Sequence, residues 1–118
     1  ITNLKELHLE RNEISDAGAK AIAGSANFSY LNFINLWKNK VGAEGAKAIA
    51  SSTILVNLKS LDLAQNNIGD EGAKALAESN TLAGLELLEI FGSGLTDEGK
   101  KQLKETTAFP KLQTLVVE

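Results

Sequence analysis

The sequence contains no cysteine and no methionine, a single proline, and only 5% aromatic residues. Without cysteine the chain can form neither a disulfide framework nor a thiolate nucleophile. No apolar run approaches the roughly 18 residues that a membrane-spanning helix needs, and no signal-peptide core is visible. These absences predict a soluble domain without a membrane partner. They leave its compartment unknown, because cytoplasmic and exported effector proteins both fit.

The formal net charge is only -3, with lysine and glutamate interspersed along the chain. A nucleic-acid-binding surface needs a clustered basic face, so we expect no nucleic-acid partner. No linker-like stretch interrupts the sequence, which predicts a single domain over residues 1–118. The chain lacks methionine and neither end reads as a polar capping repeat, so we interpret it as an excerpt of a longer protein.

A short alternating segment recurs every 27 residues. Its copies begin at Leu4, Leu31, Leu58, Leu85 and Leu112. A Gly/Ala-rich segment follows each of the first four copies, reading DAGAKAIA, AEGAKAIA, DEGAKALA and DEGKKQLK. A period of this size indicates a repeat architecture in which neighbouring units stack on one another.

Each unit combines two local patterns. The alternation of leucine with polar residues in LKELHL is typical of a strand with one buried face. The Gly/Ala-rich half predicts a helix, with start signals at Ser15, Gly42, Gly69 and Thr96 and acidic residues in the first turn. Strands stack about 4.8 Å apart but helices need about 8–10 Å, so the stack must curve with its strands inside. The predicted fold is an α/β solenoid, a horseshoe arc with a concave parallel sheet of about five strands and four convex helices.

The pattern L-x-x-L-x-L-x-x-N-x-[IVL], followed by G-A-x-x-[IL]-A, resembles leucine-rich repeats of the ribonuclease-inhibitor-like type. Similar units occur in Ran GTPase-activating proteins, NOD-like receptors and bacterial GALA-type effectors. The resemblance implies that the asparagine after each strand turns inward and bonds to neighbouring backbone groups, forming a ladder. The matching residues are Asn12, Asn39 and Asn66.

The fourth unit departs from this pattern. Ser93 stands in the ladder position, and Lys100 and Lys104 replace two alanines of the helical half. A shorter side chain reaches fewer partners, so we expect a looser turn there. The fourth helix should also be the most solvated and the least stable.

The strand residues that remain after burial form three rows across the concave face. The rows are Glu6, Phe33, Ser60, Leu87, Thr114; His8, Asn35, Asp62, Glu89, Val116; and Glu10, Trp37, Ala64, Phe91, Glu118. Two apolar pairs, Phe33 with Trp37 and Leu87 with Phe91, are predicted to lie about 10 Å apart and to frame a shallow trough. Contiguous apolar patches with a polar rim mark partner sites, although aromatics on a strand can also simply shield the sheet.

Asp62 and Glu89 are neighbours in the middle row and could share a proton or hold a hard cation. A linear row lacks the convergence that a metal site needs, so we expect two solvated carboxylates, with no metal and no cofactor. The chain has one histidine, no serine elbow and no phosphate-binding loop, so we expect no catalytic residues and no enzyme activity.

The sequence therefore predicts a protein-interaction module whose concave face binds a protein partner of unknown identity. The predicted partner-binding residues are Phe33, Trp37, Asp62, Leu87, Glu89 and Phe91. One alternative is the regulatory arm of a GTPase-activating protein resembling the Ran regulators, in which Arg11 is the only arginine. Another is a structural segment of a larger repeat protein, whose missing parts cover the aromatics. Without caps, the edge strands could also pair between copies.

Overall fold

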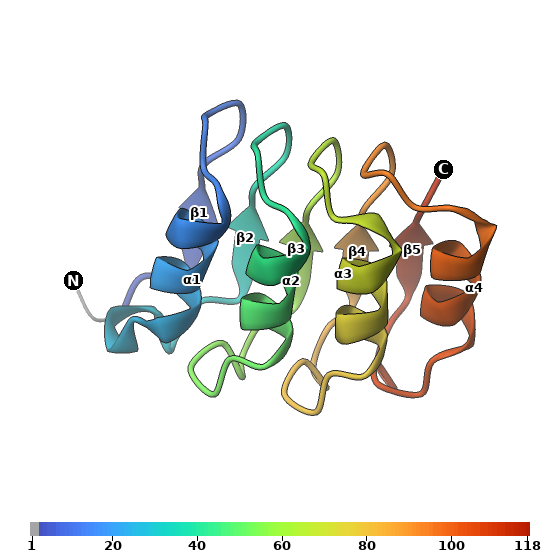
Figure 1. The fold of residues 1–118 in the computed structure, drawn as a ribbon. Helices are drawn as coiled ribbons and strands as arrows, with labels where there is room; N and C mark the ends of the chain where they lie inside the picture. The colour runs from blue at the N-terminus through green and yellow to red at the C-terminus, as the bar shows by residue number, and fades with distance from the viewer. Residues whose placement is uncertain (1–2) are drawn as a thin grey trace.

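The computed structural model describes residues 3–118. Its strands are β1 (Glu6–His8), β2 (Phe33–Asn35), β3 (Ser60–Asp62), β4 (Leu87–Glu89) and β5 (Thr114–Val116). Its helices are α1 (Asp16–Gly24), α2 (Ala43–Ala50), α3 (Gly69–Ala77) and α4 (Asp97–Glu105), with a short 3-10 turn η1 at Ala26–Phe28. The helices line up in front of a single sheet whose strands follow chain order (Figure 1). Within these described residues, the predicted solenoid of five parallel strands and four helices is confirmed.

Neighbouring strands pair in parallel with a constant shift of one repeat. Leu7 lies beside Ile34, Ile34 beside Leu61, and Leu61 beside Leu88. Because successive residues of a strand face opposite sides of a sheet, this register places one leucine or isoleucine row under the helices. Its central members are fully buried, whereas Leu7 at the β1 edge is only half-buried.

Buried asparagines join the turns that follow the strands. The side-chain amide of Asn39 donates to the carbonyl oxygens of Leu9 at 2.9 Å and Leu36 at 3.0 Å. Its carbonyl oxygen accepts from the backbone N–H groups of Asn12 at 3.1 Å and Ile14 at 3.0 Å. One side chain therefore forms hydrogen bonds with backbone groups of two consecutive units, and these groups have no partner within a helix or the sheet.

Asn66 repeats this arrangement one unit later. Its amide donates to the carbonyls of Leu36 and Leu63, and its oxygen accepts from the N–H of Val41 at 2.9 Å. Ser93 takes the next position with fewer bonds, accepting from the N–H of Asn66 at 3.2 Å and donating to the Leu63 carbonyl at 2.7 Å. The serine thus keeps the link between units that the sequence places there.

Asn12 lies at the exposed end of the series. Its amide donates only to carbonyls of its own unit, those of Leu9 at 2.9 Å and Glu10 at 3.2 Å. The side chains of Asn39 and Asn66 therefore link neighbouring units, whereas the side-chain amide of Asn12 bonds only within its own unit.

A second series of hydroxyl groups joins the opposite ends of the helices, and the sequence analysis did not identify it. The Ser52 hydroxyl donates to the Ala23 carbonyl at 2.6 Å, and the Ser79 hydroxyl donates to the Ala50 carbonyl at 2.6 Å. Thr106 bonds in the same way to the last residue of α3. A hydroxyl every 27 residues thus satisfies a carbonyl that the end of the preceding helix leaves without an intrahelical partner.

Aspartates in the first turn of a helix accept hydrogen bonds from the start of the next helix. One carboxylate oxygen of Asp16 accepts from the N–H groups of Gly42 at 2.7 Å and Gly45 at 2.9 Å, at the start of α2. Asp70 accepts from both the hydroxyl and the N–H of Thr96, and these bonds lower the pKa of the Asp70 carboxyl. Each aspartate therefore interacts with the dipole of its own helix, as the sequence predicts, and also caps the start of the helix in the next unit.

Glycines in the first helical turn allow the helices to approach one another. A Cβ at Gly45 would lie 2.8 Å from the Asp16 carboxylate and 3.0 Å from the Cβ of Ala19. A Cβ at Gly72 would lie 3.1 Å from that of Ala46. The contacts that exclude a side chain at these glycines are therefore with the preceding helix and with the turn that leads into their own helix.

The ladder gives a stability prediction. Replacing Asn66 with alanine leaves the buried N–H of Val41 without a partner and removes one of the two bonds to each of the Leu36 and Leu63 carbonyls. We therefore expect the free energy of unfolding to fall by about 2 kcal/mol. Asn12→Ala removes only exposed bonds, so its cost should stay below about 1 kcal/mol. Urea unfolding followed by circular dichroism measures both values. Equal losses would show that the asparagines act only within their own turns.

A second prediction concerns the cap between units. Asp16→Ala removes the acceptor of two N–H groups of α2 and should cost about 1 to 2 kcal/mol of stability. Asp97→Ala is the matched control, because Asp97 occupies the same first-turn position in α4 and is exposed. Losing the helix-dipole interaction alone should cost about 0.5 kcal/mol there. A similar loss in both variants, measured by chemical denaturation, would contradict capping across units.

Candidate functional site

The candidate site is the face of the sheet opposite the helices. The strand register joins Phe33, Ser60 and Leu87 in one row, and Asn35, Asp62 and Glu89 in the next. The third row follows the strand ends, where the N–H of Lys38 bonds to the Ala64 carbonyl and that of Gln65 bonds to the Phe91 carbonyl. The side chains of the three predicted rows therefore belong to consecutive, directly bonded units.

The four predicted apolar anchors, Phe33, Trp37, Leu87 and Phe91, are half-buried and lie outside the hydrophobic core cluster. They are therefore less open than their strand pattern suggested, because neighbouring side chains cover part of each ring or chain.

The largest exposed apolar side chains lie elsewhere. Tyr30 is 58% exposed and Val56 is 50% exposed, and both precede a strand in the loops that lead from helix to sheet. The sequence analysis did not single them out. Neither residue repeats at its position in neighbouring units, so a search based on the 27-residue period carried no signal for them.

Ala64 was assigned to an open row, but the structure buries it completely. Its neighbours across the turns are Trp37 and Phe91, whose side chains are far larger. A methyl group between two rings has little surface left for solvent. Ala64 therefore lies at the bottom of the trough between the two apolar pairs and offers no surface for contact with a partner.

Two cationic side chains lie close to the ring of Trp37. The Arg11 guanidinium and the Lys38 ammonium each lie 5.9 Å from the centroid of the Trp37 ring. A cation at this distance from an indole face is attracted by the negative electrostatic potential of the ring. The indole is thus part of a cluster of one aromatic and two basic residues, which we call the Trp37 cluster.

The backbone that carries this cluster is strained. Arg11, Lys38 and Gln65 occupy equivalent turn positions and have φ values of 59°, 58° and 56°, in the left-handed region. This conformation costs a residue with a side chain about 1 kcal/mol. Gly92 takes the same position in the fourth unit at φ 65°, so glycine fits the turn without this cost. The strain at Arg11 and Lys38 accompanies the two side chains that contact Trp37.

Phe33 has a different neighbour. Its ring lies 4.7 Å from that of His8, centroid to centroid, at an interplanar angle of 35°. The Nε2 atom of His8 lies 3.0 Å from a carboxylate oxygen of Glu6. The imidazole therefore extends the apolar surface of Phe33 toward the β1 edge and carries a polar group at its outer side.

The predicted carboxylate pair has an altered proton affinity. Partial burial, together with smaller contributions from the neighbouring Glu89 carboxyl and the charge of Glu10, raises the pKa of Asp62 to about 6. The N–H of Ala64, which donates to Asp62 at 2.9 Å, acts in the opposite direction. Asp62 and Glu89 thus form a half-buried acidic pair, and one oxygen of Glu10 is buried without a hydrogen-bond partner.

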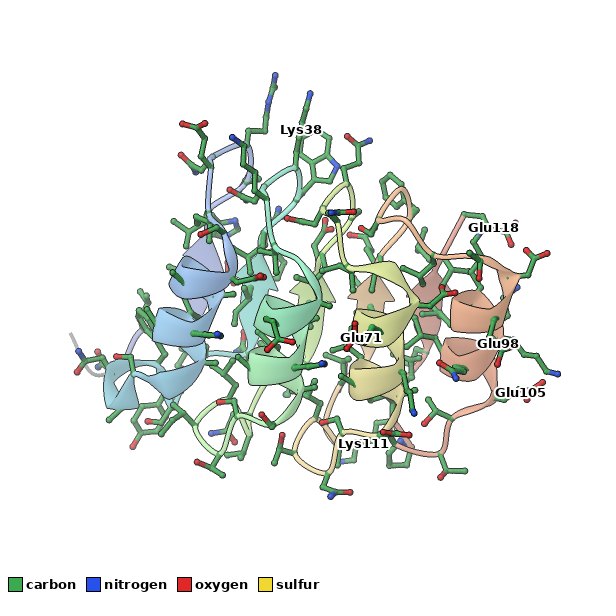
Figure 2. All side chains as sticks on the ribbon, viewed as in Figure 1. Lys38, Glu71, Glu98, Glu105, Lys111 and Glu118 are labelled. Atoms are coloured by element: carbon green, nitrogen blue, oxygen red, sulfur yellow. The ribbon has the colours of Figure 1, made fainter. Side chains whose placement is uncertain are left out.

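The turn edge of the first two units is basic. A shallow hollow of about 370 Å³ is lined by Arg11, Lys38 and Lys40 together with the two ladder asparagines of these turns. Lys40 pairs with Glu13 at 3.0 Å, and Lys38 projects outward from its turn (Figure 2). The candidate site therefore has a basic end at the Trp37 cluster and an acidic centre at Asp62 and Glu89.

Two further properties of residues 3–118 bear on the site. No group of three or more histidine, cysteine, aspartate or glutamate residues in this part of the chain could hold a metal ion. None of the helices in the same range is long and apolar enough to cross a membrane.

The repeats identify the family. A family model described as Leucine Rich repeat matches residues 1–23, 29–50 and 55–77, which together make up more than half of the chain. The chain therefore belongs to the leucine-rich repeat family. The fourth unit, with its Ser93 and its lysine substitutions, lies outside the matched segments. A search of curated proteins found no match to this chain.

Members of this family generally act as protein-interaction modules and are typically not enzymes. The family thus supports a protein partner in general terms.

The raised pKa of Asp62 leads to a pH-dependent prediction. Between about pH 4 and pH 6 the folded state holds a proton on Asp62 that the unfolded state releases, so this group makes the protein less stable as the pH rises. Asp62→Asn removes the effect and can keep the bond to Ala64, as Asn35 bonds to Trp37. We expect the variant to be the more stable protein at pH 7 but not at pH 4.

The difference should stay below about 1 kcal/mol, because Asp62 is only half-buried and solvent screens its charge. Urea unfolding at both pH values measures it, with Glu98→Gln as a control at an exposed carboxylate. A stability gain that is the same at pH 4 and pH 7 would show that the effect does not arise from the ionised carboxyl.

Proposed function

We propose that this protein is an interaction module that binds a protein partner on its concave face. Phe33, Trp37, Leu87 and Phe91 are the apolar anchors, and the charges of Asp62 and Glu89 fix the register of the partner. The mechanism is surface complementarity. Large aromatic side chains are favoured at the centres of interfaces because they bury much apolar area and lose little conformational entropy.

The Trp37 cluster is the observation that carries this proposal. Trp37 lies outside the core, yet Arg11 and Lys38 hold its ring, and both adopt a left-handed backbone that glycine would adopt more easily. Gln65 and Gly92 adopt the same left-handed turn in the next two units, so the turn belongs to the repeat and only its residues differ. In the first two units this turn carries cations that contact the indole, and these contacts preorganise the aromatic anchor for binding.

The charge pattern narrows the kind of partner. The basic end favours acidic groups on the partner near Trp37, and the acidic centre favours a basic group above Asp62 and Glu89. Opposite charges placed in this order set the direction in which a partner lies along the sheet. The anchors supply most of the binding free energy, and the charges supply orientation and discrimination.

The finer classification is also part of the proposal. We assign the repeats to the ribonuclease-inhibitor-like type, and we treat residues 1–118 as one domain. The support is a helix of eight or nine residues in each of the four full units, instead of an extended connection. The sheet shows no break between its strands over residues 3–118.

We favour partner binding on the concave face over a GTPase-activating role. Such an arm would position the groups of a bound GTPase instead of reacting itself. The guanidinium of Arg11, the only arginine of the sequence, lies over Trp37, where the aromatic contact accounts for its position. Self-association through the edges of β1 and β5 remains a separate prediction that analytical ultracentrifugation would test.

Truncation of the anchors tests the proposal. Trp37→Ala should weaken binding by about 2 kcal/mol or more if the indole is central to the interface. A practical design compares the unmodified protein with a Trp37→Ala, Phe91→Ala double variant in affinity capture from a cell lysate, with folding verified by circular dichroism. Tyr30→Ala, Val56→Ala is the matched control, because it removes two exposed apolar side chains from the loops.

A partner retained by the unmodified protein and by the loop control, but lost by the double variant, supports the concave face. Calorimetry with the recovered partner then measures the affinity loss for Trp37→Ala alone. Equal capture by all three proteins contradicts the proposal, and loss only in the loop variant moves the site to the helix-to-strand loops.

A further inference from the structure

Asp62 lies at the centre of the concave face. The strand pairing places it between Asn35 on β2 and Glu89 on β4. Along its own strand, the residues two places before and after it are Ser60 and Ala64, which face the same side of the sheet. The direct neighbours of the Asp62 side chain on this face are therefore all polar or small residues.

The four apolar anchors surround this centre. Each anchor lies one strand to the side of Asp62 and two residues before or after its paired residue, a diagonal position about 8 Å away. The anchors at the four corners are Phe33, Trp37, Leu87 and Phe91. Because Ser60 and Ala64 are much smaller than the anchors, the Asp62 carboxylate stands in a low area with large apolar side chains around it.

The carboxylates of this face have no basic partner among the described residues. The ion pairs within residues 3–118 do not include Asp62, Glu89 or Glu10. Burial raises the pKa of Asp62 to about 6, with further contributions from Glu89 and Glu10. One oxygen of Glu10 is also buried without a hydrogen-bond partner. Burial and like charges thus disfavour the ionised form of Asp62, and a cation placed beside it would reverse this effect.

An arginine side chain matches this arrangement better than a lysine side chain. Its guanidinium is planar and carries five N–H donors, so it can bond to the carboxylates of Asp62 and Glu89 together. The same plane can lie flat against an aromatic ring, and Phe91 is a neighbour of both carboxylates. An ammonium group is compact and strongly hydrated, so it gains less from a half-buried position among apolar side chains.

We propose that the protein partner inserts one arginine side chain between the four anchors, where its guanidinium bonds to the carboxylates of Asp62 and Glu89. This arginine site rests on the concave-face binding proposed above, and it specifies the residue at the centre of that contact. Apolar residues on either side of the arginine cover the anchors. The site uses β2, β3 and β4, which are the inner strands of the sheet, so it does not depend on either end of the stack.

A titration with a small arginine derivative tests the proposal. The probe is Nα-benzoyl-argininamide, and its matched control is Nα-benzoyl-citrullinamide, in which an uncharged urea group replaces the guanidinium. Two-dimensional NMR of the labelled full chain follows the amide of Ala64, which donates to Asp62 at 2.9 Å and so reports on that carboxyl. The amide of Gly45, which donates to Asp16 at 2.9 Å on the helical side, is the internal reference.

We expect the arginine derivative to shift the Ala64 amide saturably at concentrations up to about 20 mM, without a shift at Gly45. The citrulline derivative should bind at least about fivefold more weakly, because it lacks the charge-assisted bonds. Asp62→Asn should weaken binding of the arginine derivative by a similar factor. Glu98→Gln removes an exposed carboxylate on α4, on the helical side (Figure 2), and should leave the affinity unchanged.

The affinity should also depend on pH. Because of its raised pKa, Asp62 is mostly ionised at pH 7 and mostly protonated at pH 5, so binding should be about fivefold weaker at pH 5. The other charged or titratable groups of this face and its turn edge are Glu6, His8, Glu10, Arg11, Lys38, Glu89 and Glu118. Asp62→Asn separates the titration of Asp62 from theirs, and it should reduce the pH effect to less than about twofold.

Three results would each overturn the proposal. These are no saturable shift at Ala64, equal binding of the citrulline derivative or of the corresponding lysine derivative, and unchanged affinity in Asp62→Asn. The concave-face function fails separately, when capture of a partner does not depend on Trp37 and Phe91. A partner that requires these two anchors but binds Asp62→Asn as tightly as the unmodified protein would keep that function and refute the arginine site.

Discussion

Backbone groups at the ends of the strands have no partner within the sheet or the helices, and the whole arrangement depends on buried side chains that satisfy them. Asn39 and Asn66 do so by bonding to two units at once, and Ser93 continues the series with a single hydroxyl. Because these bonds cross from unit to unit, they set the spacing of the turns. That spacing in turn determines how close the open-face side chains of consecutive units lie to one another.

Most of the fold was predictable from the sequence, because leucine at a constant 27-residue spacing records the register directly. The links between helices were not. Asp16 reads as an ordinary first-turn acid, and nothing local shows that its partners are Gly42 and Gly45 of the next unit. The hydroxyl of Ser52 was in principle detectable, since serine or threonine recurs at that position. Its role depends on helix packing that only coordinates provide.

The sequence predicts which side chains share the open face of the sheet, but not their contacts or their charge state. Alternation placed Phe33, Trp37 and Asp62 on the open face, and the strand pairing joins their rows as expected. Alternation says nothing about neighbours in space. The contact of Arg11 with Trp37 requires a left-handed turn, and the raised pKa of Asp62 requires partial burial beside Glu89. Both depend on how closely consecutive units stack, a distance that side-chain patterns do not encode.

The ladder also makes the whole unit the step by which this molecule can lengthen without loss of bonds. Each unit bonds to the one before it through the same set of positions, so adding or removing a complete 27-residue unit keeps these bonds. An insertion of one residue within a strand would instead shift its alternation by one place and exchange its buried and open faces. Growth by duplication of entire units preserves every bond, while each new strand adds three open positions to the concave surface. Such a surface can diversify when a unit is duplicated and its open positions are then substituted.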